Sequence, residues 1–229
     1  MRQRIIASLL VVCVAWSSSA FAEQSPQPAT TAKPVILLTG FEPFGGDPIN
    51  ASWEVVKTFD GREIGGYTVK TALLPVVYDE MEKPLLNAIQ AAHPSIVISF
   101  GVGSAVVQIE TVARNSYHPM KPLDNKSKPP PREKIVPAAA AEIPTALPAD
   151  AILKALKDAH IGAQLSKDAG GYLCNECFYR LMQADLKVSA RGFIHVPPFG
   201  TKDPLGGSFD KDKLCKAVEL VLTTLTAKK

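Results

Sequence analysis

The chain has 229 residues, of which 46% are hydrophobic and 21% charged, and its formal net charge is +3 at pH 7. This length and composition are enough for one folded domain with a substantial core. No run of basic residues is long enough to indicate a nucleic-acid partner, so we expect none.

Residues 1–22 have the pattern of a secretory signal peptide. A basic start precedes an apolar run that is too short to span a bilayer, and small residues follow it. We therefore expect cleavage before Glu23, a periplasmic or secreted mature protein and no stable membrane span, with an uncleaved anchor or a buried helix as the alternatives. Residues 23–33, rich in Pro, Thr and Ala, predict a flexible tether, and residues 34–229 predict a single domain.

The mature chain alternates between segments typical of strands and segments typical of helices. Apolar or alternating runs predict strands over residues 33–39, 67–75, 95–100, 106–114, 163–167 and 192–196. Helical spacing predicts helices over residues 51–57, 78–93, 149–160, 174–185 and 209–227. This alternation indicates an α/β fold, a three-layer sandwich with a mixed central sheet and helices on both faces.

A proline-rich stretch over residues 116–148 interrupts this rhythm. A long segment without regular structure is unusual inside a compact domain, and such segments often serve as lids or binding loops. A mobile surface excursion is the equally weighted alternative.

Cys174 is the first candidate for a reactive side chain. It follows Gly170 and Gly171 and opens a predicted helix, where unpaired backbone N–H groups and the positive dipole end favour a thiolate. His195 lies near the end of a predicted strand, and active sites of α/β folds gather at the carboxyl ends of strands. The two residues therefore indicate a nucleophile and its base, although a free cysteine taken alone is more often inert packing.

Cys174 and Cys177 also form a Cys-x-x-Cys pair at a helix start, which is a redox motif. A thiol oxidoreductase is therefore the first alternative function. Cys215 on the last predicted helix is expected to be apolar packing. The histidines do not have metal-ligand spacing with cysteines or carboxylates, so we expect no metal.

Four segments, in this order, resemble the type I pyroglutamyl peptidases, also called pyrrolidone carboxyl peptidases. They are residues 38–46 with 50–54, 110–115, 169–175 and 192–197, and they span nearly the whole predicted domain. The resemblance implies a hydrolase, a cysteine omega-peptidase that removes the N-terminal pyroglutamyl residue from peptides and needs no cofactor. Oligomers are common in this family, so a homo-oligomer is a further possibility that the resemblance raises.

The resemblance also implies roles for individual residues. Cys174 matches the nucleophile, His195 the general base and Glu110 the partner of the imidazole. In such a triad the base takes the thiol proton and later protonates the leaving amine, while the carboxylate fixes the tautomer of the imidazole.

The substrate pocket is carried over in the same way. Phe41 and Phe44 match aromatic residues that sandwich the lactam ring, and a flat uncharged amide suits two aromatic faces. Leu173 would form an apolar wall. Asn50 would help to shape the pocket, with a plain helix cap as the alternative.

Two positions depart from the family pattern. Val102 stands where the family has a polar side chain, and Met120 stands where it has an arginine. Loss of a hydrogen-bonding group from a specific pocket lowers discrimination between substrates. A catalytically weakened binder of N-terminally blocked peptides is therefore the second alternative.

Overall fold

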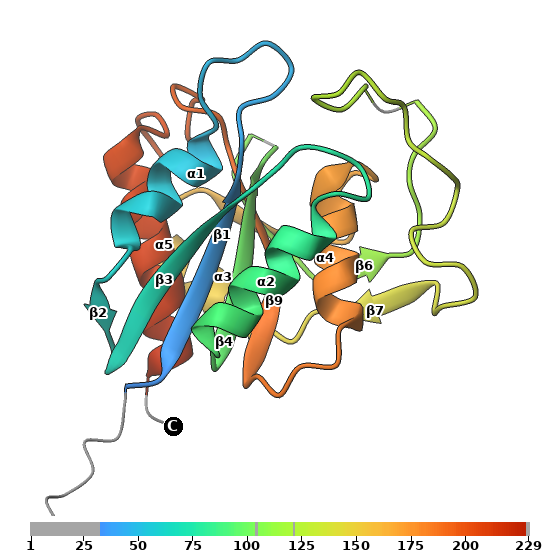
Figure 1. Ribbon diagram of the computed structural model, residues 1–229. Coiled ribbons are helices and arrows are strands. Elements are labelled where there is room, and N and C mark those ends of the chain that lie inside the picture. Colours follow the sequence, from blue (N-terminus) through green and yellow to red (C-terminus); the bar gives the residue numbers. More distant parts are fainter. Residues whose placement is uncertain (1–32, 104, 121, 228–229) are drawn as a thin grey trace, which may run out of the picture. The chain divides into compact units, whose positions relative to one another are not determined.

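The computed structural model describes residues 33–103, 105–120 and 122–227, which are built around a seven-stranded sheet (Figure 1). The spatial order of its strands is β2-β3-β1-β4-β9-β5-β8. Their bounds are β1 (Val35–Phe41), β2 (Glu63–Ile64), β3 (Tyr67–Leu74), β4 (Ile96–Val102), β5 (Val107–Glu110), β8 (Ala163–Ser166) and β9 (Ala190–Val196). The predicted signal peptide, and all of the predicted tether except Lys33, lie outside the described residues.

The sheet is mixed, as the sequence predicts. β1 pairs in parallel with β3 and β4, β4 with β9, and β5 with β8. By contrast, β5 runs antiparallel to β9, and the short β2 runs antiparallel to β3. The carboxyl ends of β1, β4 and β9 consequently meet at one edge of the sheet, and the amino end of β5 lies beside them.

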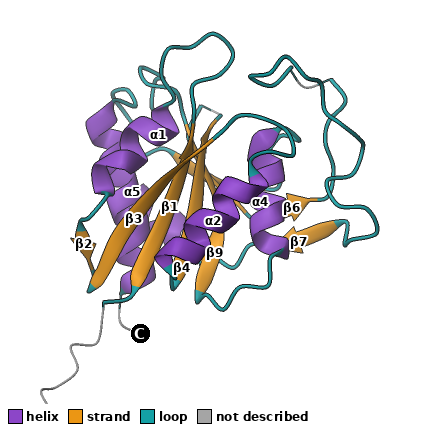
Figure 2. Cartoon of the chain, in the orientation of Figure 1, coloured by secondary structure: helices purple, strands orange, loops and turns teal. Residues whose placement is uncertain are grey.

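Helices cover both faces of this sheet (Figure 2). Their bounds are α1 (Ala51–Val56), α2 (Glu82–Ala92), α3 (Ala149–Asp158), α4 (Leu173–Gln183) and α5 (Lys211–Thr226), with a short 3-10 turn η1 (Lys57–Phe59) after α1. Buried residues of α1, α3 and α5 share one hydrophobic core, and those of α2 and α4 share the other. The three-layer α/β architecture expected from the sequence is thus confirmed.

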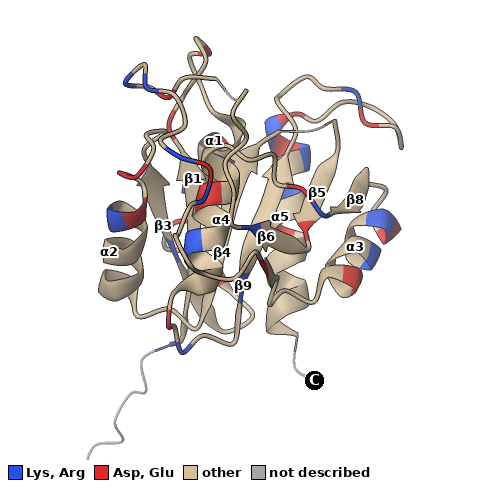
Figure 3. Cartoon of the chain, turned by 90° about the vertical axis from the view of Figure 1, so that its right-hand side faces the viewer, with Lys and Arg blue, Asp and Glu red and all other residues tan. Residues whose placement is uncertain are grey.

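The central strands are mainly apolar because both of their faces are covered. In β1, Ile36 and Leu38 belong to the core beneath α1, α3 and α5, whereas Leu37 belongs to the opposite core. A covering helix such as α3 instead has one buried face and one exposed face. On α3, Ile152 and Leu156 are buried while charged residues of both signs lie on its outer side (Figure 3).

The single strand expected over residues 106–114 is wrong, because two strands occupy this stretch. At Thr111 the backbone N–H and the hydroxyl both donate to the carbonyl of Ser166, and the Thr111 carbonyl accepts from the N–H of Thr145. The chain therefore leaves the main sheet after β5. It continues as β6 (Val112–Arg114), which pairs antiparallel with β7 (Glu142–Pro144) in a separate two-stranded sheet.

The proline-rich stretch is tied down at several points and contains β7. Asn115 donates from its side chain to the carbonyl of Val136 and accepts from the Val136 N–H. The guanidinium of Arg132 binds the Asp79 carboxylate with two nitrogens and also donates to the carbonyl of Ile135, which is fully buried. These contacts hold the stretch against the end of β6 and the turn before α2, and the Tyr179 hydroxyl on α4 donates to the carbonyl of Ala140.

Candidate active site

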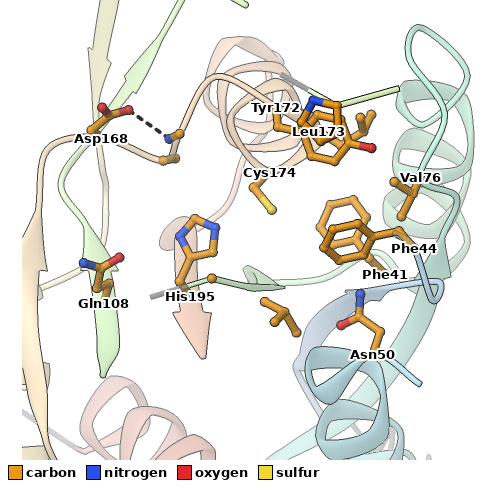
Figure 4. Close-up of a pocket in the computed structure, with 15 residues that line it drawn as sticks. Phe41, Phe44, Asn50, Val76, Gln108, Asp168, Tyr172, Leu173, Cys174 and His195 are labelled. Carbon is orange, nitrogen blue, oxygen red and sulfur yellow. Dashed lines mark hydrogen bonds between the residues drawn. The ribbon is translucent and has the colours of Figure 1, made fainter. Parts of the chain in front are cut away.

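The edge where β1, β4 and β9 end carries a cavity of about 330 Å³ (Figure 4). β9 brings His195 to this edge, and α4 begins beside it. The cavity lining includes six of the seven candidate site residues: Phe41, Phe44, Asn50, Leu173, Cys174 and His195. The seventh, Glu110, lies behind the imidazole and does not line the cavity.

Glu110 is bound to the inner side of the His195 ring. Its Oε1 lies 2.8 Å from His195 Nδ1, and the carboxyl group is fully buried. A carboxylate can only accept, so Nδ1 carries the proton and donates it, and Nε2 is left for the cavity. The second carboxylate oxygen, Oε2, has no hydrogen-bond partner within the described residues.

The environment of His195 favours its protonated form. Burial by itself would lower the pKa of the imidazole, but the neighbouring Cys174 sulfur and the Glu110 carboxylate raise that pKa to about 10. At neutral pH the ring is therefore an imidazolium held between a sulfur and a carboxylate. This is the pairing that cysteine nucleophiles require.

Two glycines at the end of β4 make room for this pair. A Cβ atom on Gly101 would lie 2.7 Å from Cys174 Sγ, and one on Gly103 would lie 3.1 Å from His195 Cδ2. Any larger residue at Gly101 would push the sulfur from its place. These glycines are not among the predicted site residues, although their Gly-x-Gly spacing at a predicted strand end is a signal that could have found them.

The turn before α4 delivers Cys174 to the cavity. Gly170 and Gly171 adopt φ values of 86° and 63°, which suit glycine and let the chain turn sharply into the helix. The helix begins at Leu173, one residue earlier than predicted, so Cys174 is its second residue. No side chain caps the N-terminal end of α4, and the first backbone N–H groups of a helix have no partner within it.

The aromatic half of the cavity lies on the side of Cys174 away from Gln108 (Figure 4). Phe41 and Leu173 are buried, whereas Phe44 is half-buried. Asn50 combines both of the roles considered for it. Its Oδ1 accepts from the Ser52 N–H at 3.0 Å and so caps α1, while the residue also lines the cavity.

Further lining residues were not anticipated, and they include Val76, Gln108, Asp168 and Tyr172. Tyr172 could have been suspected from its place next to the nucleophile segment, whereas Val76 and Gln108 carry no signal in the sequence because strand pairing alone brings them here. Val102 does line this cavity. Met120 is 84% exposed and lines a neighbouring cavity instead.

Cys177 lies in the core and not in the site. It is fully buried and unbonded to Cys174, its thiol donates to the hydroxyl of Ser99 at 3.4 Å, and burial raises its pKa far above the ordinary value. A dithiol oxidoreductase needs both sulfurs to react with an incoming partner. This arrangement gives no support to the oxidoreductase alternative.

Neither a metal-binding cluster nor a helix able to span a membrane occurs among the described residues. No group of three or more His, Cys, Asp and Glu side chains in this part of the chain is placed to hold a metal ion. None of the helices in the same residues has the length and apolar character needed to cross a membrane.

The chain is similar in sequence to a family of known proteins. The family model described as pyroglutamyl peptidase matches residues 34–221, which include all seven candidate site residues. A pyrrolidone-carboxylate peptidase from Gloeobacter violaceus is 36% identical over 197 residues, covering 83% of this chain and 96% of that protein. One from Escherichia fergusonii is 36% identical over 199 residues, covering 82% and 91%.

Solved structures of proteins with the same names are also similar to this chain. The crystal structure of pyroglutamyl peptidase I from Bacillus amyloliquefaciens matches with a TM-score of 0.78 at 31% identity, covering 86% of this chain and 96% of that one. A mutant pyrrolidone carboxyl peptidase from Pyrococcus furiosus matches with a TM-score of 0.76 at 30% identity, covering 83% and 97%.

Proposed function

This chain belongs to the pyroglutamyl peptidase family, and we propose that it hydrolyses the bond after an N-terminal pyroglutamyl residue with Cys174 as nucleophile, His195 as base and Glu110 as its partner. It is an enzyme, a cysteine-type hydrolase. The observation that carries the assignment of roles is that His195, bonded to the buried Glu110 carboxylate, lines the same cavity as Cys174.

The chemistry begins with the ion pair of Cys174 and His195. The thiolate attacks the carbonyl carbon of the pyroglutamyl group, and His195 Nε2 gives its proton to the leaving amine as the C–N bond breaks. Water then attacks the resulting thioester, with the now neutral imidazole as base. Glu110 keeps the ring oriented and balances its positive charge while the proton is present.

The start of α4 supports the negative charge that develops on the carbonyl oxygen. Backbone N–H groups at a helix N-terminus have no intrahelical partner and point along the positive end of the helix dipole. The N–H groups of Leu173 and Cys174 are in this position. We assign the oxyanion site to this helix end, beside the nucleophile.

The aromatic half of the cavity accounts for selection of a cyclised N-terminus. Its walls include Phe41, Phe44, Val76 and Leu173, and the single acidic residue in the cavity lining is Asp168, on the other side of Cys174 (Figure 4). A lactam is flat and uncharged and so suits these walls. A free N-terminal ammonium would lose hydration there without a carboxylate to replace it.

The test is hydrolysis of a chromogenic pyroglutamyl amide by the purified protein under reducing conditions. Wild type and Cys215→Ser should release the chromophore, because Cys215 lies on α5 and does not line the cavity. Cys174→Ala should reduce release to the uncatalysed rate. The corresponding glutamyl amide, with its free ammonium, should not be cleaved. Equal release by wild type and Cys174→Ala would end the assignment of the nucleophile.

A further inference from the structure

The cavity has a second half that the recognition of a lactam ring does not use. Cys174 and His195 stand between the aromatic pair on one side and Gln108 with Asp168 on the other (Figure 4). If the ring occupies the aromatic half, the scissile bond lies at the sulfur, and the rest of the substrate must leave toward the polar half. The residues there face the leaving peptide.

Gln108 is placed and chemically free to meet this part of the substrate. It lies directly opposite His195 in the antiparallel pairing of β5 with β9, so both side chains project from the same face of the sheet. Glu110, two residues further along the strand, accepts the hydrogen bond from the His195 imidazole. The carboxamide of Gln108 is half-buried and makes no side-chain hydrogen bond to another residue of the described chain.

A second cavity of about 430 Å³ continues from the polar half. It shares Asp168 and Gly170 with the first cavity and extends past Gly171 to residues 116–120 of the proline-rich stretch. The N–H of His118 donates to the carbonyl of Gly171 at 2.9 Å, which fixes that stretch against the turn before α4. The path away from His195 is therefore lined by backbone that this hydrogen bond holds to the turn before α4.

We infer that Gln108 and this second cavity bind the peptide that follows the pyroglutamyl group, an inference that rests on the proposed function. A carboxamide offers one acceptor and two donors and so matches the C=O and N–H of a peptide unit. The substrates are then pyroglutamyl peptides that continue for at least two residues. The Asp168 carboxylate at the junction disfavours an acidic side chain directly after the pyroglutamyl group.

The experiment compares kcat/KM for a pyroglutamyl arylamide, which lacks further peptide units, with kcat/KM for a pyroglutamyl tetrapeptide. Gln108→Ala should lower the ratio of tetrapeptide to arylamide kcat/KM about fivefold, the loss of one neutral hydrogen bond. Gln164→Ala is the matched control. Gln164 pairs with Gln108 from β8 but is exposed and lines neither cavity, so its variant should keep the wild-type ratio.

The outcomes separate this inference from the proposed function. Equal losses on both substrates in Gln108→Ala, or no loss on either, would overturn the role of Gln108 while the peptidase assignment stands. Failure of folded wild type to cleave either substrate would overturn the proposed function, and this inference with it. A second tetrapeptide with Glu after the pyroglutamyl group should be cleaved more slowly than its Gln counterpart, and Asp168→Asn should reduce that difference.

Discussion

Gly101→Ala tests the placement of the nucleophile without altering any group that takes part in the chemistry. Gly101 is not among the glycines with positive φ, so an alanine there is not strained by its backbone. Its new Cβ would lie 2.7 Å from Cys174 Sγ and 2.8 Å from Phe193 Cζ. Because ordinary contact begins at 3.4 Å, the sulfur must retreat by at least 0.7 Å, the difference between these two distances.

A displacement of this size should be costly for catalysis. Misplacement of a reacting group by about 1 Å can reduce the rate roughly a hundredfold, because the bound substrate no longer meets it in an attacking geometry. We therefore expect kcat/KM for a pyroglutamyl amide to fall roughly a hundredfold. Gly103→Ala is the graded comparison, since its Cβ would lie 3.1 Å from His195 Cδ2 and needs a shift of only 0.3 Å to reach 3.4 Å.

The assay combines kinetics with a thermal midpoint for each variant. The midpoint is needed because the ring of Phe193 is fully buried, and crowding it destabilises the fold as well. A Gly101→Ala protein with both a wild-type midpoint and a wild-type kcat/KM would refute the reasoning. So would a larger loss in Gly103→Ala than in Gly101→Ala.

Three further predictions concern charge and processing. Burial alone would lower the pKa of His195, but Cys174 and Glu110 hold it at about 10, so activity should fall as pH rises through that value. Glu110→Gln should move this upper limit of activity to lower pH and reduce kcat at least about a hundredfold. A pH–rate profile of both proteins measures the two effects. Burial raises the pKa of Glu176 from 4.5 to about 7, so the folded protein holds this proton more tightly than the unfolded chain does, and stability falls as pH rises from 4.5 through 7. One pKa unit corresponds to roughly 1.4 kcal/mol, so the free energy of unfolding of Glu176→Gln relative to wild type should increase by about 3 kcal/mol from pH 4 to pH 8, measured by urea unfolding. The same difference in unfolding free energy between the two proteins at both pH values would contradict this. We also propose export, and mass spectrometry should find a mature protein that begins at Glu23, whereas retention of Met1 would contradict signal-peptide cleavage.

The parts of the fold that could be predicted are those encoded by local pattern. β1, β4 and β9 were located from apolar runs, because a strand covered on both faces must be apolar on both. The break at Thr111 between β5 and β6 could not be predicted from the sequence, because the alternation typical of a strand continues across it. Only contacts with Ser166 and Thr145 divert the chain there.

The site residues likewise separate into those that a local sequence pattern indicates and those that it does not. Cys174 and His195 stand out from the sequence because each lies at the end of a regular element, where reactive groups gather. Glu110 was identified only through the resemblance to a family, and Gln108 was missed. Both depend on β5 lying beside β9, an adjacency between residues 85 positions apart in the chain that no local pattern contains.

The antiparallel direction of β5 explains why its two polar residues have different environments. Because β9 runs outward to the cavity and β5 runs inward from it, each step along β5 goes deeper into the sheet. Gln108 lies opposite His195 at the cavity, and Ile109 lies opposite Ile194, so Glu110 falls one residue deeper, beneath the imidazole. There the carboxylate is out of water and its attraction for the imidazolium is weakly screened. A parallel strand in this position would run outward beside β9, and a residue two places after Gln108 would face the cavity and its solvent. The mixed sheet thus buries the acid that holds the base and leaves the amide beside it open to a ligand.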